Sequence, residues 1–346
     1  MATFEATAET AAKNLESGRT LRELSDLVTP MAIRVAITLR IAQKIDVGRL
    51  TAEVLAADTG TDADVLERIL LHLVTVGVLT RNERGEFGLT RIGEDMLVES
   101  GKAANPPWLD LNTVAGRAEL TFTRLLDVAR TGKVAYSAQY GTSFWDDLTR
   151  DTSSGTAFDL VMARGMERRI HEIAKAYDWG SLGTVVDVGG GNGTLLAGLL
   201  HAHPGLRGTV LDRHAEPALR TFKDAGLSER ATAISGSFLK PLPPGAGGYI
   251  LSRIQSDWND ADVRTILGHC RKAAEPQGKI IIIDEFATEE GVRCNSEDDL
   301  RMLVYYGGKE RTMEQVRALA TDVGLSVESL RAAADWTIME LVPTEL

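Results

Sequence analysis

The sequence predicts an α/β protein in which a small helical domain precedes a Rossmann-like domain with a mostly parallel sheet. Helices followed by a hairpin occupy the N-terminal part, and short β-rich runs alternate with helical patterns after residue 180. A glycine-rich turn follows the first of these runs. At 346 residues the chain has room for more than one domain. We expect boundaries that divide it into 1–105, 106–180 and 181–346.

Composition predicts a cytoplasmic protein and disfavours several classes of partner. The apolar share of 44% and charged share of 25% are ordinary for a globular protein. We expect no membrane span and no secretory signal, since no apolar run reaches 18 residues and the first twenty residues are polar. Cys270 and Cys294 lack paired spacing, which argues against disulfides and a cysteine zinc site. A net charge of −11 argues against nucleic acid as a partner.

The N-terminal segment predicts a winged helix. Residues 21–45 form a helical pattern that is apolar on several sides, as expected at a subunit interface. A short helix is expected near 51–58 and a capped helix over 62–76. Two strand-like runs, Val78–Thr80 and Phe87–Leu89, follow with a turn between them.

A winged helix can read DNA or mediate dimerisation. The helix in the recognition position offers only Arg68 and His72 for base contacts, against the acidic Asp62, Asp64 and Glu67. Readers of base edges need a cationic approach to the duplex. The sequence therefore favours dimerisation.

The remainder of the chain predicts a helical segment and then the α/β domain. Residues 106–179 are mainly helical and rich in aromatic side chains. Five β-rich runs follow, at Thr184–Val188, Gly208–Asp212, Thr232–Ser235, Tyr249–Ile254 and Lys279–Asp284. Helical patterns between the first two and between the last two indicate a parallel sheet covered on both faces. After a helix at 312–323, Ser326–Leu330 and Thr337–Val342 are expected to form a closing hairpin.

The glycine turn is the first candidate binding site. A buried-strand pattern runs directly into Gly189, Gly191 and Gly193, and a helical run follows. The spacing G-x-G-x-G is tighter than the dinucleotide fingerprint G-x-G-x-x-G, so it suits a ligand without a pyrophosphate. Asp212 ends the next strand, where a carboxylate can accept hydrogen bonds from both ribose hydroxyls. A turn without a ligand and a nicotinamide site are the alternatives.

Several runs together resemble the small-molecule O-methyltransferases, in particular the actinobacterial branch that acts on aromatic polyketides and includes naphthoate and anthracycline methyltransferases. The likeness covers about residues 20–343. The runs are Thr29–Ala36, Tyr140–Trp145, Val186–Gly193, Val210–Asp212, Gly236–Phe238, Asp257–Asp260 and Gly307–Thr312.

This resemblance implies a class I methyltransferase domain with a seven-stranded sheet, a winged-helix dimerisation domain and a helical linker that roofs the acceptor pocket. It implies S-adenosylmethionine as cofactor, S-adenosylhomocysteine as product, and a homodimer. Gly189 and Gly191 would hold the methionine part and Asp212 the ribose. The other implied cofactor contacts are Ser237 and Phe238 at the adenine, Ser252 and Arg253 at the sulfonium end, and Trp258 against the methionine moiety or the sheet end.

The same resemblance implies an acceptor pocket on the helical segments. Its implied residues are Trp108, Asn112, Phe158, Met162, Met166, Met302 and Tyr306. Methionines and aromatic residues at helical spacing are equally typical of a core. Arg164, Arg168 and Arg169 are placed to pair with an acidic substrate or to form a solvated helix face.

The chain departs from the family at the catalytic base. Most members have His-Asp-Trp where this sequence has Ser256-Asp257-Trp258. A serine hydroxyl is a weak base and is too short to reach the same point. The residues that orient the base in the family, Asp284 and Glu310, are retained.

Three interpretations follow from this departure. First, methyl transfer can rest on proximity and orientation, worth on the order of 7–11 kcal/mol at best, with an acceptor that is already ionised. Second, Asp284, Glu310 or His171 can replace the missing base. Third, the fold can keep the cofactor while hydroxylating, decarboxylating or cyclising its substrate.

We expect the first: a dimeric, metal-independent methyltransferase that methylates an oxygen of an aromatic polyketide-type compound. A ligand-responsive winged-helix regulator is the non-enzymatic alternative.

Overall fold

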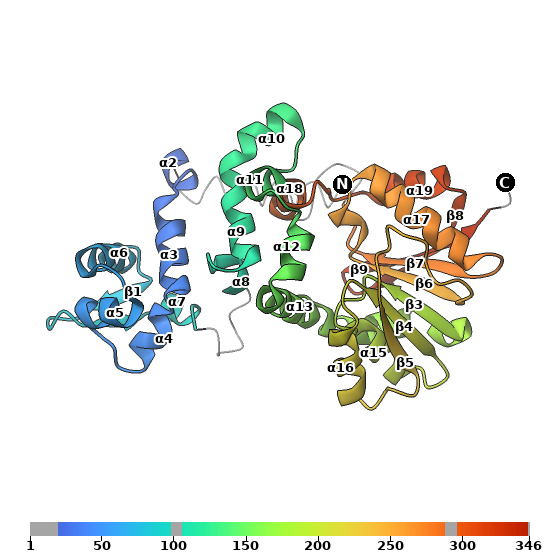
Figure 1. Cartoon of the computed structure of the whole chain (residues 1–346), viewed down its shortest axis with the longest axis horizontal. Coiled ribbons are helices and arrows are strands. Elements are labelled where there is room, and N and C mark those ends of the chain that lie inside the picture. The colour runs from blue at the N-terminus through green and yellow to red at the C-terminus, as the bar shows by residue number, and fades with distance from the viewer. Residues whose placement is uncertain (1–19, 98–105, 288–295, 345–346) are drawn as a thin grey trace, which may run out of the picture. The chain divides into compact units, whose positions relative to one another are not determined.

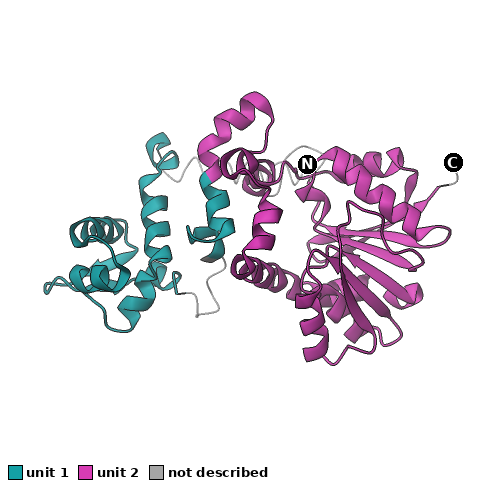
Figure 2. Cartoon of the chain, viewed as in Figure 1, with its two compact units in different colours: residues 1–120 teal, residues 121–346 magenta. Residues whose placement is uncertain are grey.

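The computed structural model describes residues 20–97, 106–287 and 296–344. The chain forms two compact units, residues 1–120 and 121–346 (Figure 2). The sequence instead places boundaries at 105 and 180, and that three-part division stays a prediction. None of the helices formed by the described residues is long and apolar enough to cross a membrane.

Unit 1 is a helical domain closed by a two-stranded hairpin. Its elements are α2 (Leu21–Leu24), α3 (Val28–Thr38), α4 (Ile41–Asp46), α5 (Ala52–Thr59), α6 (Ala63–Thr75), β1 (Leu79–Arg81), β2 (Phe87–Leu89), α7 (Arg91–Glu94), α8 (Pro106–Leu109) and α9 (Val114–Leu120). The Asp62 side chain caps α6 by accepting from the Val65 amide at 3.0 Å. Leu55, Leu70 and Phe87 are buried in the core beneath it. The predicted winged-helix order of helices and hairpin is confirmed.

The N-terminal helix is shorter than the sequence predicts. The expected single helix over 21–45 is divided into α2, α3 and α4, and Arg40 between the last two has a left-handed φ of 58°. Its apolar side chains are not all covered within the unit, because Leu21 is 82% exposed and Leu27 is 70% exposed. Large exposed apolar side chains that lie together are typical of an interface.

Unit 2 begins with helices that carry an aromatic cluster. They are the 3₁₀ helix η2 (Thr121–Arg124), α10 (Leu125–Thr131), α11 (Ala135–Tyr140), α12 (Phe144–Arg150), α13 (Thr152–Glu167) and α14 (Ile170–Ala176). The mainly helical stretch predicted over 106–179 is thus interrupted at Arg168 and Arg169, between α13 and α14. Phe144 is buried at the centre of the cluster, and the rings of Tyr136, Trp145 and Phe158 meet it edge-on.

A seven-stranded sheet follows in the order β5-β4-β3-β6-β7-β9-β8 (Figure 1). Its strands are β3 (Thr184–Val188), β4 (Arg207–Asp212), β5 (Ala231–Ser235), β6 (Gly248–Ser252), β7 (Lys279–Asp284), β8 (Leu325–Ala333) and β9 (Trp336–Pro343). The first five are parallel, and β9 pairs antiparallel with both β7 and β8. This confirms the predicted mostly parallel sheet and its closing hairpin. Strand β6 ends at Ser252 rather than at Ile254, because Arg253 turns the chain with a φ of 53°.

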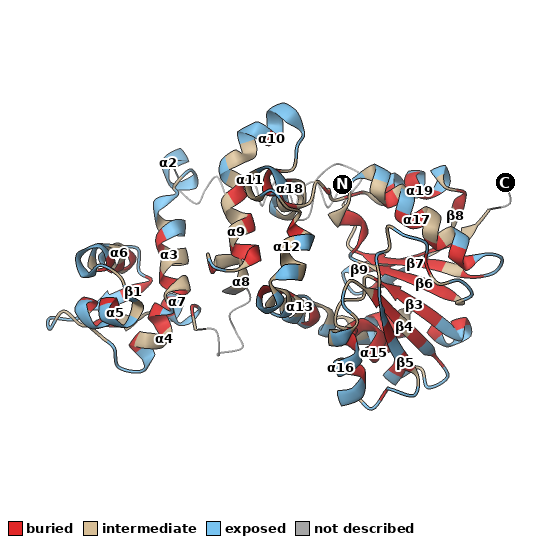
Figure 3. Cartoon of the chain, in the orientation of Figure 1, coloured by how far each residue is buried: buried red, intermediate tan, exposed pale blue. Residues whose placement is uncertain are grey.

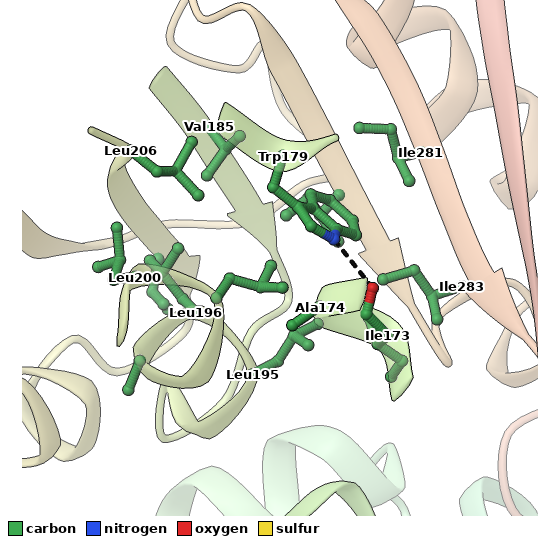
Figure 4. Packing of buried hydrophobic residues seen from close by; sticks show 14 of the residues in the cluster. Ile173, Ala174, Trp179, Val185, Leu195, Leu196, Leu200, Leu206, Ile281 and Ile283 are labelled. Atoms are coloured by element: carbon green, nitrogen blue, oxygen red, sulfur yellow. Dashed lines mark hydrogen bonds between the residues drawn. The ribbon is translucent and has the colours of Figure 1, made fainter. Parts of the chain in front are cut away.

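Helices cover both faces of the sheet, whose strands are largely buried (Figure 3). They are α15 (Thr194–Ala202), α16 (Glu216–Asp224), α17 (Asp260–Ala274) and α19 (Met313–Asp322). Helix α18 (Ser296–Tyr305) instead packs against α11 and η2. Helices α15 and α16 pack on one face and α17 and α19 on the other (Figure 1). On the first face, the indole nitrogen of the fully buried Trp179 donates to the Ile173 carbonyl at 3.0 Å (Figure 4).

The topology places a ligand site at one edge of this sheet. The strand order reverses between β3 and β6, and in open α/β sheets ligands bind outside the carboxyl ends of the strands at such a reversal. The glycine turn follows β3 there, and the segment from Arg253 to Trp258 follows β6.

Candidate active site

The glycine turn after β3 is shaped for close approach by a ligand. Gly189, Gly191 and Gly193 have φ of 77°, 55° and 77°, a region that favours glycine. A Cβ on Gly189 would lie 2.5 Å from Ile254 Cδ1 and 3.1 Å from Phe238 Cε1. The structure therefore brings the predicted residues Gly189 and Phe238 together, with no space for a side chain between them.

Asp212 lies beside this turn, at the end of β4. Its Oδ2 accepts a hydrogen bond from the Gly191 amide at 2.9 Å, and its Oδ1 accepts from the Arg213 amide at 2.7 Å. Each carboxylate oxygen can accept a further hydrogen bond. The geometry thus leaves Asp212 able to bind hydroxyl groups, as the sequence predicts.

Asp187 in β3 is a further site residue that the sequence reading does not single out. It is 1% exposed, and neither carboxylate oxygen has a hydrogen-bond partner within the described parts of the chain. Burial, and then the nearby Asp212, raise its pKa to about 7. Leaving such a group unpaired costs about 1–3 kcal/mol or more. An acid among buried valines directly before a glycine turn is the sequence signal that points to it.

The adenine side of the predicted site is aromatic. Trp258 packs edge-on against Phe238, with ring centroids 5.4 Å apart, and both lie over the α17 face of the sheet. Ser237 accepts a hydrogen bond from the Leu239 amide at 3.3 Å. Ser252 ends β6, and its buried hydroxyl has no partner among the described residues. Phe238 and Trp258 thus form one aromatic group beside Gly189.

The three predicted catalytic residues do not form one hydrogen-bonded group. Ser256 is buried in the 3₁₀ helix η4 (Gln255–Asp257). The buried Asp284 at the end of β7 instead accepts from the Gln255 side-chain amide at 3.2 Å and from the Glu285 backbone amide at 2.9 Å. Gln255 therefore donates a hydrogen bond to Asp284, the carboxylate that the resemblance assigns to orienting the base.

A buried arginine holds Gln255 in place. The Arg311 guanidinium is fully buried and donates to Asp260 Oδ1 at 2.7 Å, to the Trp258 carbonyl at 2.8 Å and to Gln255 Oε1 at 3.3 Å. It also donates to the Gln255 carbonyl. A Cβ on Gly308 would lie 2.1 Å from the Ser256 carbonyl oxygen. The segment around Ser256 is thus fixed through its backbone. No pattern in the sequence assigns this structural role to Arg311.

Ionisable groups gather around Arg253 at the carboxyl ends of β6 and β7. Burial opposes the charge on Arg253, but Asp284, Asp257 and Glu310 outweigh it and raise its pKa. Burial raises the pKa of Asp257 to about 8 and that of Glu310 to about 7, while Arg253 partly offsets both shifts. Burial also raises the pKa of Asp284. Asp257 and Glu310 can therefore exchange protons near neutral pH.

Of the predicted acceptor residues, Phe158 and Tyr306 lie together. Both rings pack against Trp145, with centroids 5.9 Å away for Phe158 and 4.9 Å away for Tyr306. Burial and the nearby Asp257 raise the pKa of Tyr306, so this ring lies between the aromatic cluster and the acidic groups. Met302 on α18 is half-buried and Met162 on α13 is exposed. Trp108 and Asn112 belong to unit 1.

Two other candidates have different surroundings. His171 lines a separate surface recess of about 550 Å³ with Lys175, His203 and Arg331, and Asp284 and Glu310 are not among its lining residues. The Arg169 guanidinium forms an ion pair with Asp335 at 2.6 Å, so this arginine is not held ready for a substrate.

Comparison with known proteins agrees with this geometry. The model of the O-methyltransferase domain matches residues 122–326, and that of the O-methyltransferase dimerisation domain matches residues 22–99. The chain is 46% identical to 2,7-dihydroxy-5-methyl-1-naphthoate 7-O-methyltransferase of Streptomyces carzinostaticus, over 93% of this chain and 96% of the relative. It is also 41% identical to aclacinomycin 10-hydroxylase of Streptomyces purpurascens, over 92% of this chain and 87% of that protein.

A solved structure matches over nearly the whole chain. An O-methyltransferase of neocarzinostatin biosynthesis, in complex with S-adenosylmethionine and 2-hydroxy-5-methyl naphthoic acid, superposes with a TM-score of 0.87 and 44% identity. The match covers 94% of this chain and 99% of that one. The same enzyme is solved with S-adenosyl-L-homocysteine and 1,4-dihydroxy-2-naphthoic acid. Fold, site and sequence agree, and the chain belongs to the O-methyltransferase family with its dimerisation domain.

Proposed function

We propose that this protein is a cytoplasmic, homodimeric, S-adenosylmethionine-dependent O-methyltransferase that acts on an aromatic hydroxy acid of the polyketide type. Residues 1–105 would form the dimerisation domain, 106–180 the linker and 181–346 the cofactor domain. The observation that carries the proposal is Asp187, a buried carboxylate without a hydrogen-bond partner among the described residues, beside a turn in which Gly189 and Gly190 leave no room for a side chain. Relatives that methylate naphthoates support the acceptor class.

The cofactor fits the groups at the ends of β3 and β4. Asp187 would accept hydrogen bonds from the ammonium group of its methionine part, which removes the penalty of an unpaired buried carboxylate. Gly189 and Gly191 would line the methionine part, Asp212 would bind the ribose, and Ser237 and Phe238 would border the adenine. Ser252, Arg253 and Trp258 would lie near the sulfonium end. When bound, S-adenosylmethionine supplies an electrophilic methyl group.

The acceptor would lie between aromatic side chains and the acidic cluster. Tyr306 links these two groups, because it stacks on Trp145 and lies near Asp257. A flat aromatic ring suits such a surface. The proposed acceptor residues are Trp108, Asn112, Phe158, Met162, Met302 and Tyr306.

Transfer would rest on orientation, because no strong base is available at residue 256. The hydrogen bond from Gln255 engages Asp284, and the positive charge of Arg253 favours an acceptor oxygen that is already ionised. Holding an ionised oxygen in line with the methyl group supplies the large effect of proximity. Asp284 and Glu310 would keep Arg253 charged and positioned rather than remove a proton.

Labelled cofactor tests this function. The protein is incubated with S-adenosylmethionine labelled in its methyl group and with 1,4-dihydroxy-2-naphthoic acid or related hydroxy acids. Label in the product and release of S-adenosylhomocysteine are expected. A changed substrate with unconsumed cofactor would instead favour hydroxylation, the activity named for the 41% identical relative.

A further inference from the structure

Arg213 joins two parts of unit 2 through its two ends. Its backbone amide donates to Asp212 Oδ1 at 2.7 Å, so the main chain of Arg213 is bonded to the carboxylate proposed to hold the ribose. The other oxygen of that carboxylate accepts from Gly191 in the glycine turn. A ligand that donates a hydrogen bond to Asp212 therefore affects a carboxylate that is hydrogen-bonded to the backbone of Arg213.

The side chain of Arg213 reaches α12. Its Nη1 lies 3.5 Å from Asp146 Oδ1 and 3.5 Å from Thr149 Oγ1. Its guanidinium carbon lies 5.7 Å from the centroid of the Trp145 ring, within the range of a cation–π contact. Burial lowers the pKa of Arg213, opposed by Asp146 and Asp212, but an arginine keeps its charge in proteins. One side chain thus contacts three residues within about one turn of α12, namely Trp145, Asp146 and Thr149.

Trp145 belongs to what we term the aromatic wall, namely Phe144, Trp145, Phe158 and Tyr306. Trp145 stacks on Tyr306 with ring centroids 4.9 Å apart and an interplanar angle of 21°. Phe144 meets Tyr306 at 4.9 Å and Phe158 meets Trp145 at 5.9 Å, both edge-on. The wall therefore packs as one group, and a shift of Trp145 displaces Tyr306 and Phe158.

Helix α13 makes a second approach to the same carboxylate. Burial, and then the nearby Asp212, raise the pKa of Asp159 to about 6. Asp159 directly follows Phe158 of the aromatic wall. Helices α12 and α13, which carry three of the four wall residues, therefore both come close to the proposed ribose site, α12 through Arg213 and α13 through Asp159.

From these contacts we infer that Arg213 is a positioning residue that couples cofactor binding to acceptor binding. The inference rests on the proposed function and adds how its two sites act on each other. A ribose bound to Asp212 fixes the backbone of Arg213, the guanidinium then holds α12, and the aromatic wall is preorganised for a flat acceptor. Couplings between sites in proteins amount to about 5–150-fold in affinity.

A binding cycle on the full-length protein tests this role. Calorimetry measures the Kd of 1,4-dihydroxy-2-naphthoic acid with and without saturating S-adenosylhomocysteine, and then the reverse order. We expect saturating S-adenosylhomocysteine to lower the Kd of 1,4-dihydroxy-2-naphthoic acid at least about fivefold in the wild type. The same ratio should be found when the two ligands are added in the reverse order. In Arg213→Met the ratio should fall to within about twofold of one. The Kd for S-adenosylhomocysteine alone should change little, because the backbone amide remains.

Two variants control for loss of charge or fold. Arg264→Met removes an arginine of similar exposure that pairs with Asp322 at 2.8 Å away from the aromatic wall, and it should keep the wild-type ratio. Arg213→Lys should restore part of the coupling. Melting temperatures should be alike for all variants.

Separate outcomes overturn the coupling and the function. An unchanged ratio in Arg213→Met, or a wild type that binds both ligands independently, overturns the coupling and leaves the methyltransferase proposal standing. A wild type that binds no S-adenosylhomocysteine, or no hydroxy acid, overturns the proposed function and this inference with it.

Discussion

The carboxyl ends of β3 and β4 differ from those of β6 and β7 in how their polar groups are paired. Near the end of β3, Asp187 is buried and has no hydrogen-bond partner in the part of the chain that the structure describes, and Gly189 beside it has no room for a side chain. After β6 and β7, Gln255, Asp284 and Arg311 are buried and hydrogen-bonded to one another. Buried polar groups in proteins are nearly always paired, so Asp187 needs a ligand to complete it, whereas Gln255, Asp284 and Arg311 pair with one another. The buried Ser252 hydroxyl at the end of β6 is an exception in the second region, since it has no partner among the described residues.

This difference separates binding from catalysis. The carboxyl ends of β3 and β4 supply the groups that a cofactor needs, and these groups do not depend on which reaction follows. The carboxyl ends of β6 and β7 fix the backbone and the carboxyl groups of the proposed reaction site, where residue 256 is a serine and not a strong base. Variants in the two regions should therefore change different quantities.

The largest effect is expected from filling the glycine turn. In Gly189→Val the side chain would collide with Ile254 and Phe238, and the φ of 77° is unsuited to a β-branched residue. We expect the Kd for S-adenosylhomocysteine, measured by calorimetry, to rise by about 100-fold or more. The displaced turn would no longer contact the ligand. Gly268→Ala in α17 meets open space and should leave the Kd unchanged while adding up to about 1 kcal/mol of stability. Unimpaired binding in Gly189→Val would remove the turn from the site.

The second effect concerns stability in the other region. Gln255→Leu leaves Asp284 Oδ2 without its donor and removes one acceptor of the buried Arg311. We expect the free energy of unfolding, measured with urea at pH 7, to fall by about 1–3 kcal/mol. Gln139→Leu removes a half-buried glutamine bonded to the Tyr140 hydroxyl and should cost less. Equal losses in the two variants would contradict a special role for the Gln255 network.

The third effect is a pH dependence of cofactor binding. Burial raises the pKa of Asp187 to about 7 in the free protein, and an ammonium group binds only its ionised form. Affinity for S-adenosylhomocysteine should therefore rise as the pH increases through 7, and below 7 it should fall by up to about tenfold per unit. Asp187→Asn should bind more weakly at pH 8 and show a flat profile. Asp159→Asn serves as control, and a sloped profile in Asp187→Asn would assign the titration to another group.

The smallest effect is expected at the position of the missing base. In Ser256→His the new imidazole would find Asp284 already bonded to Gln255, and an ionised acceptor needs no base. We expect kcat at pH 8 to stay within about threefold of the wild type, well below the effect of a general base. A gain of about 100-fold would show that general-base catalysis is the missing element. A gain only in the double variant with Gln255→Leu would show that Gln255 blocks it.

The proposed cofactor half of the site can be read from local patterns. Gly189 and Gly191 come shortly after β3 and Asp212 is the last residue of β4, so strand, turn and carboxylate can be read from adjacent residues. The strands and the closing hairpin follow from apolar runs for the same reason. The partnerless state of Asp187 could not be read this way, since it depends on what lies across the sheet.

The other half depends on contacts between distant segments. Arg311, Gln255 and Asp284 come from three separate stretches, and no spacing in the sequence joins them. The helix breaks at Arg40 and at Arg168 cannot be predicted from local sequence, because neither position is a proline or a glycine. Arg253 ends β6 in a left-handed conformation that the apolar run through Ile254 conceals.

The close approach of Gly308 to the Ser256 carbonyl bears on how this fold diversifies. Gly308 and the buried Arg311 fix the main chain there through backbone contacts. A substitution at residue 256 during evolution would therefore leave this backbone in place. The chemistry at this position can change while the fold is retained. Two relatives that are over 40% identical to this chain are named for methylation in one case and for hydroxylation in the other.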